Sequence, residues 1–108
     1  MPELIRYGDD KVHELRFVSF SPTIERRDDM WVDIDLRFEL SEDSFVPADL
    51  IDLTALVICT HAGDPVQIVP QDEGTDCEYQ FTAGEKEQIE AFIRSEPVQR
   101  AIAEAVSD

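Results

Sequence analysis

Basic residues are scarce in this sequence. Only 9 of its 108 residues are Lys or Arg, against 25 Asp or Glu, and the net charge is −16. Nucleic acids and anionic membranes are bound through basic side chains that replace their counterions. We therefore expect no direct binding to nucleic acid or membrane. So large a charge of one sign also favours attraction to basic partners.

The sequence also has few cysteines and no long apolar segment. The two cysteines are Cys59 and Cys77, and no stretch approaches the roughly 20 apolar residues that a membrane helix requires. Residues 1–6 lack the basic region and apolar run of a secretory leader. We therefore expect a cytoplasmic protein with free thiols, because disulfides are rare in reducing compartments.

The four glycines stand singly, so the sequence has no glycine-rich phosphate-binding loop. Its hydrophobic content of 43% nevertheless argues for a packed core. A chain of 108 residues is close to the commonest domain size and needs no metal or disulfide to fold. We expect a single acidic domain over residues 1–108, with no cofactor.

Residues 30–40 show the clearest periodicity, with apolar side chains at every second position from Met30 to Leu40. This pattern predicts a strand with one face in the core and one in water. Residues 11–25 are rich in β-forming side chains, but their imperfect alternation predicts either a strand with a bulge or one covered on both faces. The two segments should form an antiparallel hairpin, and Pro22 should lie at an edge or bend because it has no N–H to donate.

Further strands are predicted at residues 53–60, 66–69 and 78–81, with a polar acidic loop at 70–77. The segment 53–60 is almost continuously apolar, which is typical of a central strand buried on both faces. A turn signal at residues 8–10 sets residues 2–7 apart as a short element, and Pro47 predicts a short helical turn over 47–52.

The period then changes from two to that of a helix. Thr82 and Glu85 fit a capping box, and Ile89, Phe92 and Ile93 give an apolar stripe. Pro97 should break this helix at residue 96 and open a second, amphipathic one that ends near residue 106. Strands first and helices last predict an α+β fold: an antiparallel sheet of about four to five strands with two C-terminal helices packed on one face.

Candidate chemical sites are weak. Cys59, His61, Cys77 and His13 are zinc-ligand types, but their spacing matches no standard zinc pattern. Cys59 and His61 are two apart on one strand, too far for a nucleophile and base in most rotamers. Several Asp and Glu residues could ligate calcium or magnesium, yet no segment has the twelve-residue calcium loop. We expect neither a metal site nor an enzyme.

The outward positions of residues 31–39 form the strongest candidate for a binding surface. They place an indole and four charged groups in a line, about 6.6 Å apart along the strand. Trp and Arg are enriched at binding hot spots. The simpler interpretation is the solvated face of an antiparallel sheet. The candidate partner-binding residues are Trp31, Asp33, Asp35, Arg37 and Glu39.

Three functions remain open. The first is a non-catalytic acidic interaction protein that binds, and inhibits, a partner with a basic surface, such as a nucleic-acid-processing enzyme or a toxin. Immunity proteins, nucleic-acid mimics and phage-encoded inhibitors are of this general kind. The second is an assembly subunit, for example a homodimer, whose apolar helix at residues 97–106 completes an interface. The third is a metal-binding protein or small enzyme.

Overall fold

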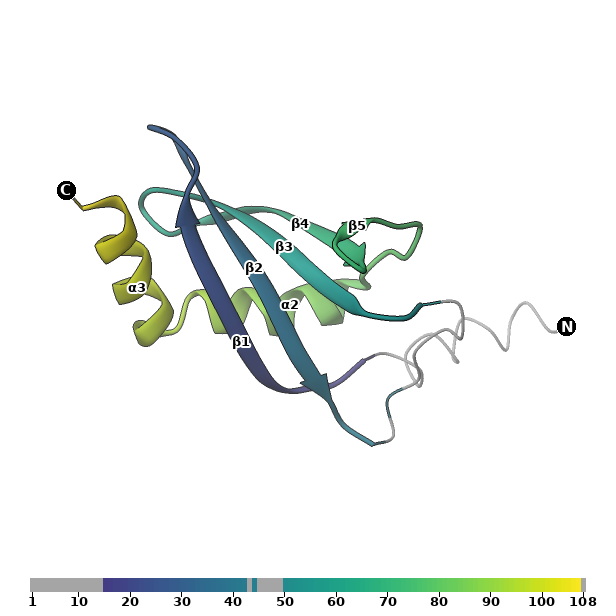
Figure 1. The fold of residues 1–108 in the computed structure, drawn as a ribbon. Helices are drawn as coiled ribbons and strands as arrows, with labels where there is room; N and C mark the ends of the chain where they lie inside the picture. Colours follow the sequence, from purple (N-terminus) through teal and green to yellow (C-terminus); the bar gives the residue numbers. More distant parts are fainter. Residues whose placement is uncertain (1–14, 43, 45–49, 108) are drawn as a thin grey trace, which may run out of the picture.

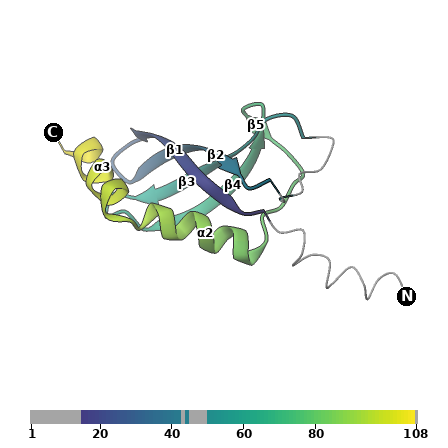
Figure 2. The same ribbon diagram turned by 90° about the horizontal axis from the view of Figure 1, so that it is seen from below.

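The computed structural model describes residues 15–42, 44 and 50–107. Its strands form one sheet in the order β1-β2-β3-β4-β5, and every neighbouring pair is antiparallel. Both helices lie on the same side of this sheet (Figures 1 and 2), so the predicted α+β fold is confirmed. The elements are β1 (Phe17–Arg26), β2 (Trp31–Leu40), β3 (Leu53–Thr60), β4 (Pro65–Asp72), β5 (Thr75–Asp76), α2 (Ala83–Ile93) and α3 (Glu96–Val106).

The hairpin of β1 and β2 is confirmed. Phe20 lies opposite Phe38 and Ile24 opposite Ile34, and the register shifts at the start of β1, between residues 17 and 19. Of the two predicted explanations for the imperfect alternation, this irregularity supports the bulge. It leaves the Val18 side chain 65% exposed. β1 is an edge strand of the sheet, which is the place where a proline such as Pro22 is tolerated.

The predicted phase of β2 is also correct for the strand itself. Val32, Ile34 and Leu36 are fully buried, and they face the two helices. Met30, however, is 64% exposed, because it belongs to the turn before the strand and not to its inner face. Trp31 is partly exposed on the opposite side of the strand.

β3 is the central strand, as predicted, but its two faces differ. Its alternate residues Ala55, Val57 and Cys59 are fully buried on the helix side. On the other side of β3, Leu56 and Ile58 are partly exposed, whereas Thr54 is buried. None of the helices and strands described here lies over that side (Figure 2). The expectation of burial on both faces therefore holds on the outer side only at Thr54, since Leu56 and Ile58 remain partly exposed.

The strand predicted at residues 78–81 is wrong. β4 extends to Asp72, and the short β5 follows inside the segment predicted as a loop. Glu73 and Gly74 both have positive φ, 54° and 83°, and such a pair makes the tight turn of a two-residue hairpin. The alternation of Tyr79 and Phe81 has another cause, since both rings pack on the core from a non-strand segment.

The two helices begin and break close to where the sequence predicts. Thr82 Oγ1 accepts a hydrogen bond from Glu85 N at 3.1 Å, and Glu85 Oε1 accepts one from Thr82 N at 3.0 Å. This is the predicted capping box. α2 ends at residue 93 and α3 begins at 96, with Pro97 in its first turn, and the buried helix residues are Glu85, Ile89, Ile93, Val98 and Ile102.

The Glu85 side chain does more than cap its own helix. It is only 1% exposed, and its Oε2 accepts a hydrogen bond from Leu15 N at 2.7 Å while its Oε1 accepts one from Tyr79 Oη at 2.8 Å. Gln88, one turn further along α2, accepts from Phe17 N at 3.0 Å and donates to Leu15 O at 2.8 Å. The first turns of α2 thus hold the chain that leads into β1.

Aromatic stacking continues this attachment along the sheet. Phe20 of β1 stacks on Phe92 of α2 with ring centroids 4.5 Å apart, and Phe17 meets Phe38 edge-on at 4.7 Å. Such aromatic pairs add about 0.5–1.5 kcal/mol beyond the area they bury. They fix α2 across the inner side of the β1–β2 hairpin.

The turn between β3 and β4 is attached to α3 by one side chain. Gly63 has a φ of +95°, and Gln99 Nε2 donates to its carbonyl oxygen at 3.0 Å and to Ile93 O at 2.8 Å. The Gln99 amide fills the space that a Cβ at residue 63 would occupy. Glycine is therefore required here by both its backbone angle and its missing side chain.

Two predicted elements lie wholly or partly outside the described residues. The short element at residues 2–7 lies outside the described residues, as do residues 11–14 and 47–49. The remaining part of the predicted helical turn, residues 50–52, is not helical.

Replacing Glu85 by Gln should destabilise the fold. The amide keeps one acceptor oxygen but places an NH₂ group where Leu15 N now donates. A buried donor left without an acceptor costs about 1–3 kcal/mol. We expect a loss of this size in the free energy of unfolding, measured by urea titration.

Glu87→Gln is the matched control, because residue 87 is exposed on the same helix and the change in charge is identical. It should alter stability by less than about 0.5 kcal/mol. Equal effects of the two substitutions would show that the buried contacts of Glu85 contribute nothing.

Candidate interaction surface

All five predicted binding residues lie on β2 and share the sheet face that points away from α2 and α3, which we call the outer face. The side chains of Asp35, Arg37 and Glu39 are exposed, and those of Trp31 and Asp33 are partly exposed. The strict alternation of β2 puts them there, because every inward position between them is apolar. The structure therefore brings the five residues together in one line.

Two members of this line are engaged in ion pairs with residues outside it. Arg27 contacts both oxygens of Asp33, with Nη2 2.8 Å from Oδ1 and Nε 3.0 Å from Oδ2. Arg37 Nη1 lies 3.2 Å from Asp52 Oδ1. The Arg37–Asp52 pair is exposed, and exposed pairs contribute roughly 0–1 kcal/mol to stability, whereas Asp33 is partly buried. The main effect of both pairs is to hold the charged groups in fixed positions on the outer face.

Neighbouring carboxylates on β1 extend the negative charge. The register places Glu25 directly opposite Asp33, and like charges in that position repel. Glu39 accepts a hydrogen bond from Ser19 Oγ at 3.0 Å. The carboxylate of Asp35 makes no hydrogen bond or ion pair with any residue that the structure describes. Sequence reasoning missed Glu25 because the bulge in β1 hides which of its residues face outward.

An apolar area adjoins these carboxylates. Ile58 on β3 lies opposite Asp33, Leu56 lies opposite Asp35, and Val69 on β4 lies opposite Leu56. All three apolar side chains are partly exposed. The outer face is therefore amphipathic across the strands, with carboxylates on β1 and β2 and three aliphatic side chains on β3 and β4. On β4, Val69 lies between the polar Gln67 and Gln71. The sequence alone did not reveal this area, because β3 was expected to be covered on both sides.

The tip of the β1–β2 hairpin fixes the position of Trp31. Asp28 Oδ1 accepts hydrogen bonds from Met30 N at 2.9 Å and from Trp31 N at 2.8 Å. These two donors are the main reason that the pKa of Asp28 lies below its ordinary value of 3.8. His61 Nε2 lies 2.8 Å from Asp28 O and joins the tip to the end of β3. The indole thus stands on a braced turn at one end of the outer face.

The described cysteine and histidine residues, Cys59, His61 and Cys77, do not come together in one site. Cys59 is fully buried in the core, whereas His61 contacts the hairpin tip and Cys77 is a partly exposed free thiol beyond β5. Burial, with a smaller contribution from Asp64, raises the pKa of the Cys59 thiol to about 11. His13 lies outside the described residues.

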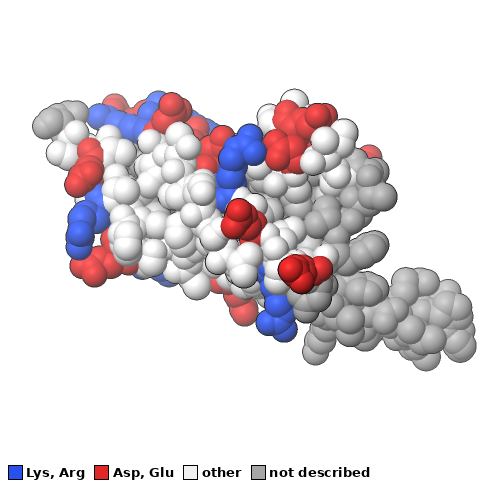
Figure 3. Space-filling view, turned by 60° about the horizontal axis from the view of Figure 1, so that its bottom comes forward, with Lys and Arg blue, Asp and Glu red and all other residues white. Residues whose placement is uncertain are grey.

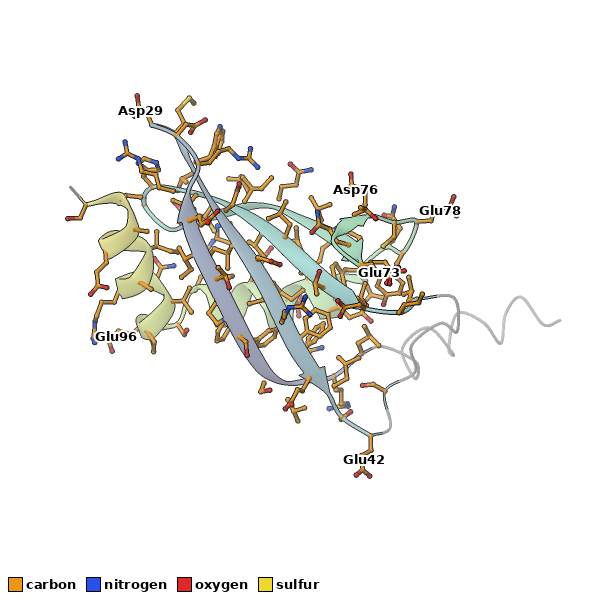
Figure 4. All side chains as sticks on the ribbon, viewed as in Figure 1. Asp29, Glu42, Glu73, Asp76, Glu78 and Glu96 are labelled. Atoms are coloured by element: carbon orange, nitrogen blue, oxygen red, sulfur yellow. The ribbon has the colours of Figure 1, made fainter. Side chains whose placement is uncertain are left out.

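Acidic side chains are spread over the molecule. Figure 4 shows labelled carboxylates at the hairpin tip (Asp29), beyond β2 (Glu42), around β5 (Glu73, Asp76, Glu78) and at the start of α3 (Glu96). Among the residues that the structure describes, no group of three or more His, Cys, Asp or Glu side chains is arranged to hold a metal ion.

A shallow groove of about 250 Å³ runs along β4 beside α2. Residues 65–68 line one side, and Lys86 and Glu90 line the other. These two ionisable groups are four residues apart on one helix, an arrangement typical of a solvated helix surface.

A different face of the molecule includes an uncharged area. In Figure 3, this white area lies between charged side chains at the margins and others near the middle of the view. No residue of β1 from Phe17 to Ile24 carries a charge, and β1 is an edge strand of the sheet. Uncharged edges of this length are places where a second chain can pair.

No family model, curated protein or solved structure matches this chain. Within the described residues, no helix has the length and apolar content needed to cross a membrane. The features of this chain that bear on function are therefore the geometry of its outer face and its charge.

The buried thiol gives a direct test of the arrangement around Cys59. At neutral pH, a pKa near 11 in place of 9.0 lowers the thiolate fraction about 100-fold, and burial restricts access further. We expect Cys77 to react with a thiol reagent in the native protein and Cys59 to remain unmodified until the protein unfolds. Mass spectrometry of the labelled peptides checks this, with urea-unfolded protein as the control. Rapid labelling of native Cys59 would contradict the burial seen here.

Proposed function

We propose that this protein is a non-catalytic acidic interaction protein that binds, and thereby inhibits, a partner with a basic surface. The observation that carries the proposal is the outer face. It is uncovered by the described elements, and it presents carboxylates on adjacent strands beside a braced indole. The acidic residues of this face are Glu25, Asp33, Asp35, Glu39 and Asp52, and its two basic residues, Arg27 and Arg37, are already paired.

Charge supports this function through the rate of association. A net charge of −16 attracts basic surfaces over long range and repels nucleic acid and acidic proteins. Complementary charge chiefly raises the association rate and selects against wrong partners. A nucleic-acid-processing enzyme or a toxin that acts on nucleic acid has the basic surface this requires. Inhibition follows because an occupied basic surface can no longer bind its substrate.

The described residues also support a non-catalytic role. The groove beside α2 contains only one base and one acid, and the buried Cys59 thiol has its pKa raised away from reactivity. Both cysteines are free thiols, which suits the reducing cytoplasm that we propose as the location.

Binding kinetics test the proposal. A partner is first captured from the native host and purified, and its binding is measured at two salt concentrations. Asp33→Asn combined with Asp35→Asn should slow association by about 3- to 10-fold at low salt, because surface charges act on encounter. Trp31→Ala should instead speed dissociation by about 10-fold, because an aromatic anchor is lost from the contact.

The matched control is Glu73→Gln with Asp76→Asn, which removes the same charge from exposed residues around β5. Asp35→Asn alone is a second control, because replacing Asp33 also releases Arg27 from its ion pair. Unchanged rates in the Asp33, Asp35 and Trp31 variants would mean that the outer face is only solvated. Equal slowing by the β5 variant would assign the effect to net charge alone.

A second candidate function is assembly through the uncharged edge of β1, supported by the exposed Val18 on its bulge. The apolar face of α3 is less suited to this role than the sequence indicated, since Val98 and Ile102 are buried in the core. Light scattering after size exclusion tests it: a dimer that persists at high salt and dissociates in Val18→Lys, but not in Val66→Lys on β4, favours assembly. A monomer at all salt concentrations excludes it.

A further inference from the structure

We propose that the segment of the partner that occupies the outer face is a cationic amphipathic α-helix, lying along β2 and β3 with its apolar stripe on Leu56, Ile58 and Val69. This inference rests on the proposed function and specifies the partner further. It follows from the composition of β3, from the lateral order of charges on the outer face, and from the hydrogen-bonding needs of whatever covers a sheet face.

The aliphatic residues on the outer side of β3 indicate that another element covers this side in the functional state. Strands with near-continuous apolar sequence are typical of sheets buried on both faces, whereas one-sided sheets alternate apolar and polar residues. β2 alternates strictly, but β3 has aliphatic residues on both sides, with Leu56 and Ile58 outward. The helix side is filled by α2 and α3. The outer side has no such layer among the described elements.

The order of side chains across the strands determines which groups a segment covering the outer face must carry. In the sheet register, Thr23, Asp35, Leu56 and Val69 follow one another across β1 to β4. Glu25, Asp33, Ile58 and the exposed Gln67 form the next row, so the aliphatic group in that row lies on β3 alone. Strands are about 4.8 Å apart, so carboxylates and aliphatic groups are separated by one strand spacing. A complementary surface must carry an apolar stripe flanked on one side by basic groups.

A helix satisfies these requirements better than an extended segment. A single extended peptide laid on a sheet face leaves its backbone N–H and C=O groups without partners, which is costly once water is excluded. A helix satisfies them internally. Its diameter of about 10–12 Å also matches the roughly 10 Å between β2 and β4. From Trp31 to Arg37 the face is about 20 Å long, which corresponds to about 13 helical residues.

Synthetic peptides test this without knowledge of the natural partner. The first is a 14-residue peptide of Leu and Lys with Leu at helical spacing. The second has the same composition but strictly alternating Leu and Lys, and the third has Ser in place of every Leu. Binding of each fluorescently labelled peptide is followed by anisotropy at low and moderate salt.

The protein variants separate the two halves of the outer face. Ile58→Thr removes apolar surface while keeping a β-branched residue in the strand, and Asp35→Asn removes one carboxylate. The matched controls are Val66→Thr on β4, at a residue that is 54% exposed, and Glu73→Gln beside β5. We expect the helical peptide to bind the parent about 10-fold more tightly than either other peptide. Ile58→Thr and Asp35→Asn should each weaken it several-fold, and the two controls should not.

The possible failures are distinct. If the Ser-containing peptide binds as tightly and only Asp35→Asn weakens it, the acidic docking function stands and the helical occupant is overturned. If no basic peptide binds, or if Glu73→Gln weakens binding as much as Asp35→Asn, both proposals are overturned. If light scattering shows a dimer that Ile58→Thr dissociates, the cover is a second copy of this chain and the helical partner is overturned.

Discussion

The buried carboxylate of Glu85 joins the helical layer to the sheet, and much of the architecture depends on it. Burying a carboxylate without a cation is costly. Here the cost is offset by hydrogen bonds from Leu15 N, Thr82 N and Tyr79 Oη, three donors from three separate positions of the chain. The same group therefore starts α2, orients the segment before it and aligns the entry to β1. Because Glu85 holds α2 on the inner side of the hairpin, α2 does not cover the outer face of the sheet.

The parts of this fold that the sequence predicts are those governed by local patterns. Strict alternation determines which side of β2 faces the core, and the spacing of Thr82 and Glu85 determines where α2 begins. Both patterns act within a few residues, so they can be recognised without knowing the tertiary structure. The candidate residues on β2 could be placed on one face for the same reason. Leu15, by contrast, is hydrogen-bonded to Glu85 although the two residues are 70 positions apart, and no local pattern predicts that contact.

The remainder depended on pairings that the sequence does not show. β5 exists because Glu73 adopts a positive φ, which is uncommon for a residue other than glycine. The ion pair of Arg27 with Asp33 and the proximity of Glu25 follow from the register of β1 after its bulge. The apolar half of the outer face was hidden because an unbroken aliphatic run does not reveal which of its sides another element covers. The candidate surface was thus predicted as a line of charges, whereas the structure places aliphatic side chains beside that line.

The contact between Gly63 and Gln99 links two positions whose variation cannot be independent. The Gln99 amide occupies the volume of an absent methyl group and donates to the carbonyl oxygens of both Gly63 and Ile93. A side chain at 63 would have to displace that amide, and a shorter residue at 99 would leave both carbonyls without this donor. Among sequences that share this fold, a change at either position should therefore be accompanied by a change at the other. Such paired variation would show that the turn between β3 and β4 coevolves with the start of α3.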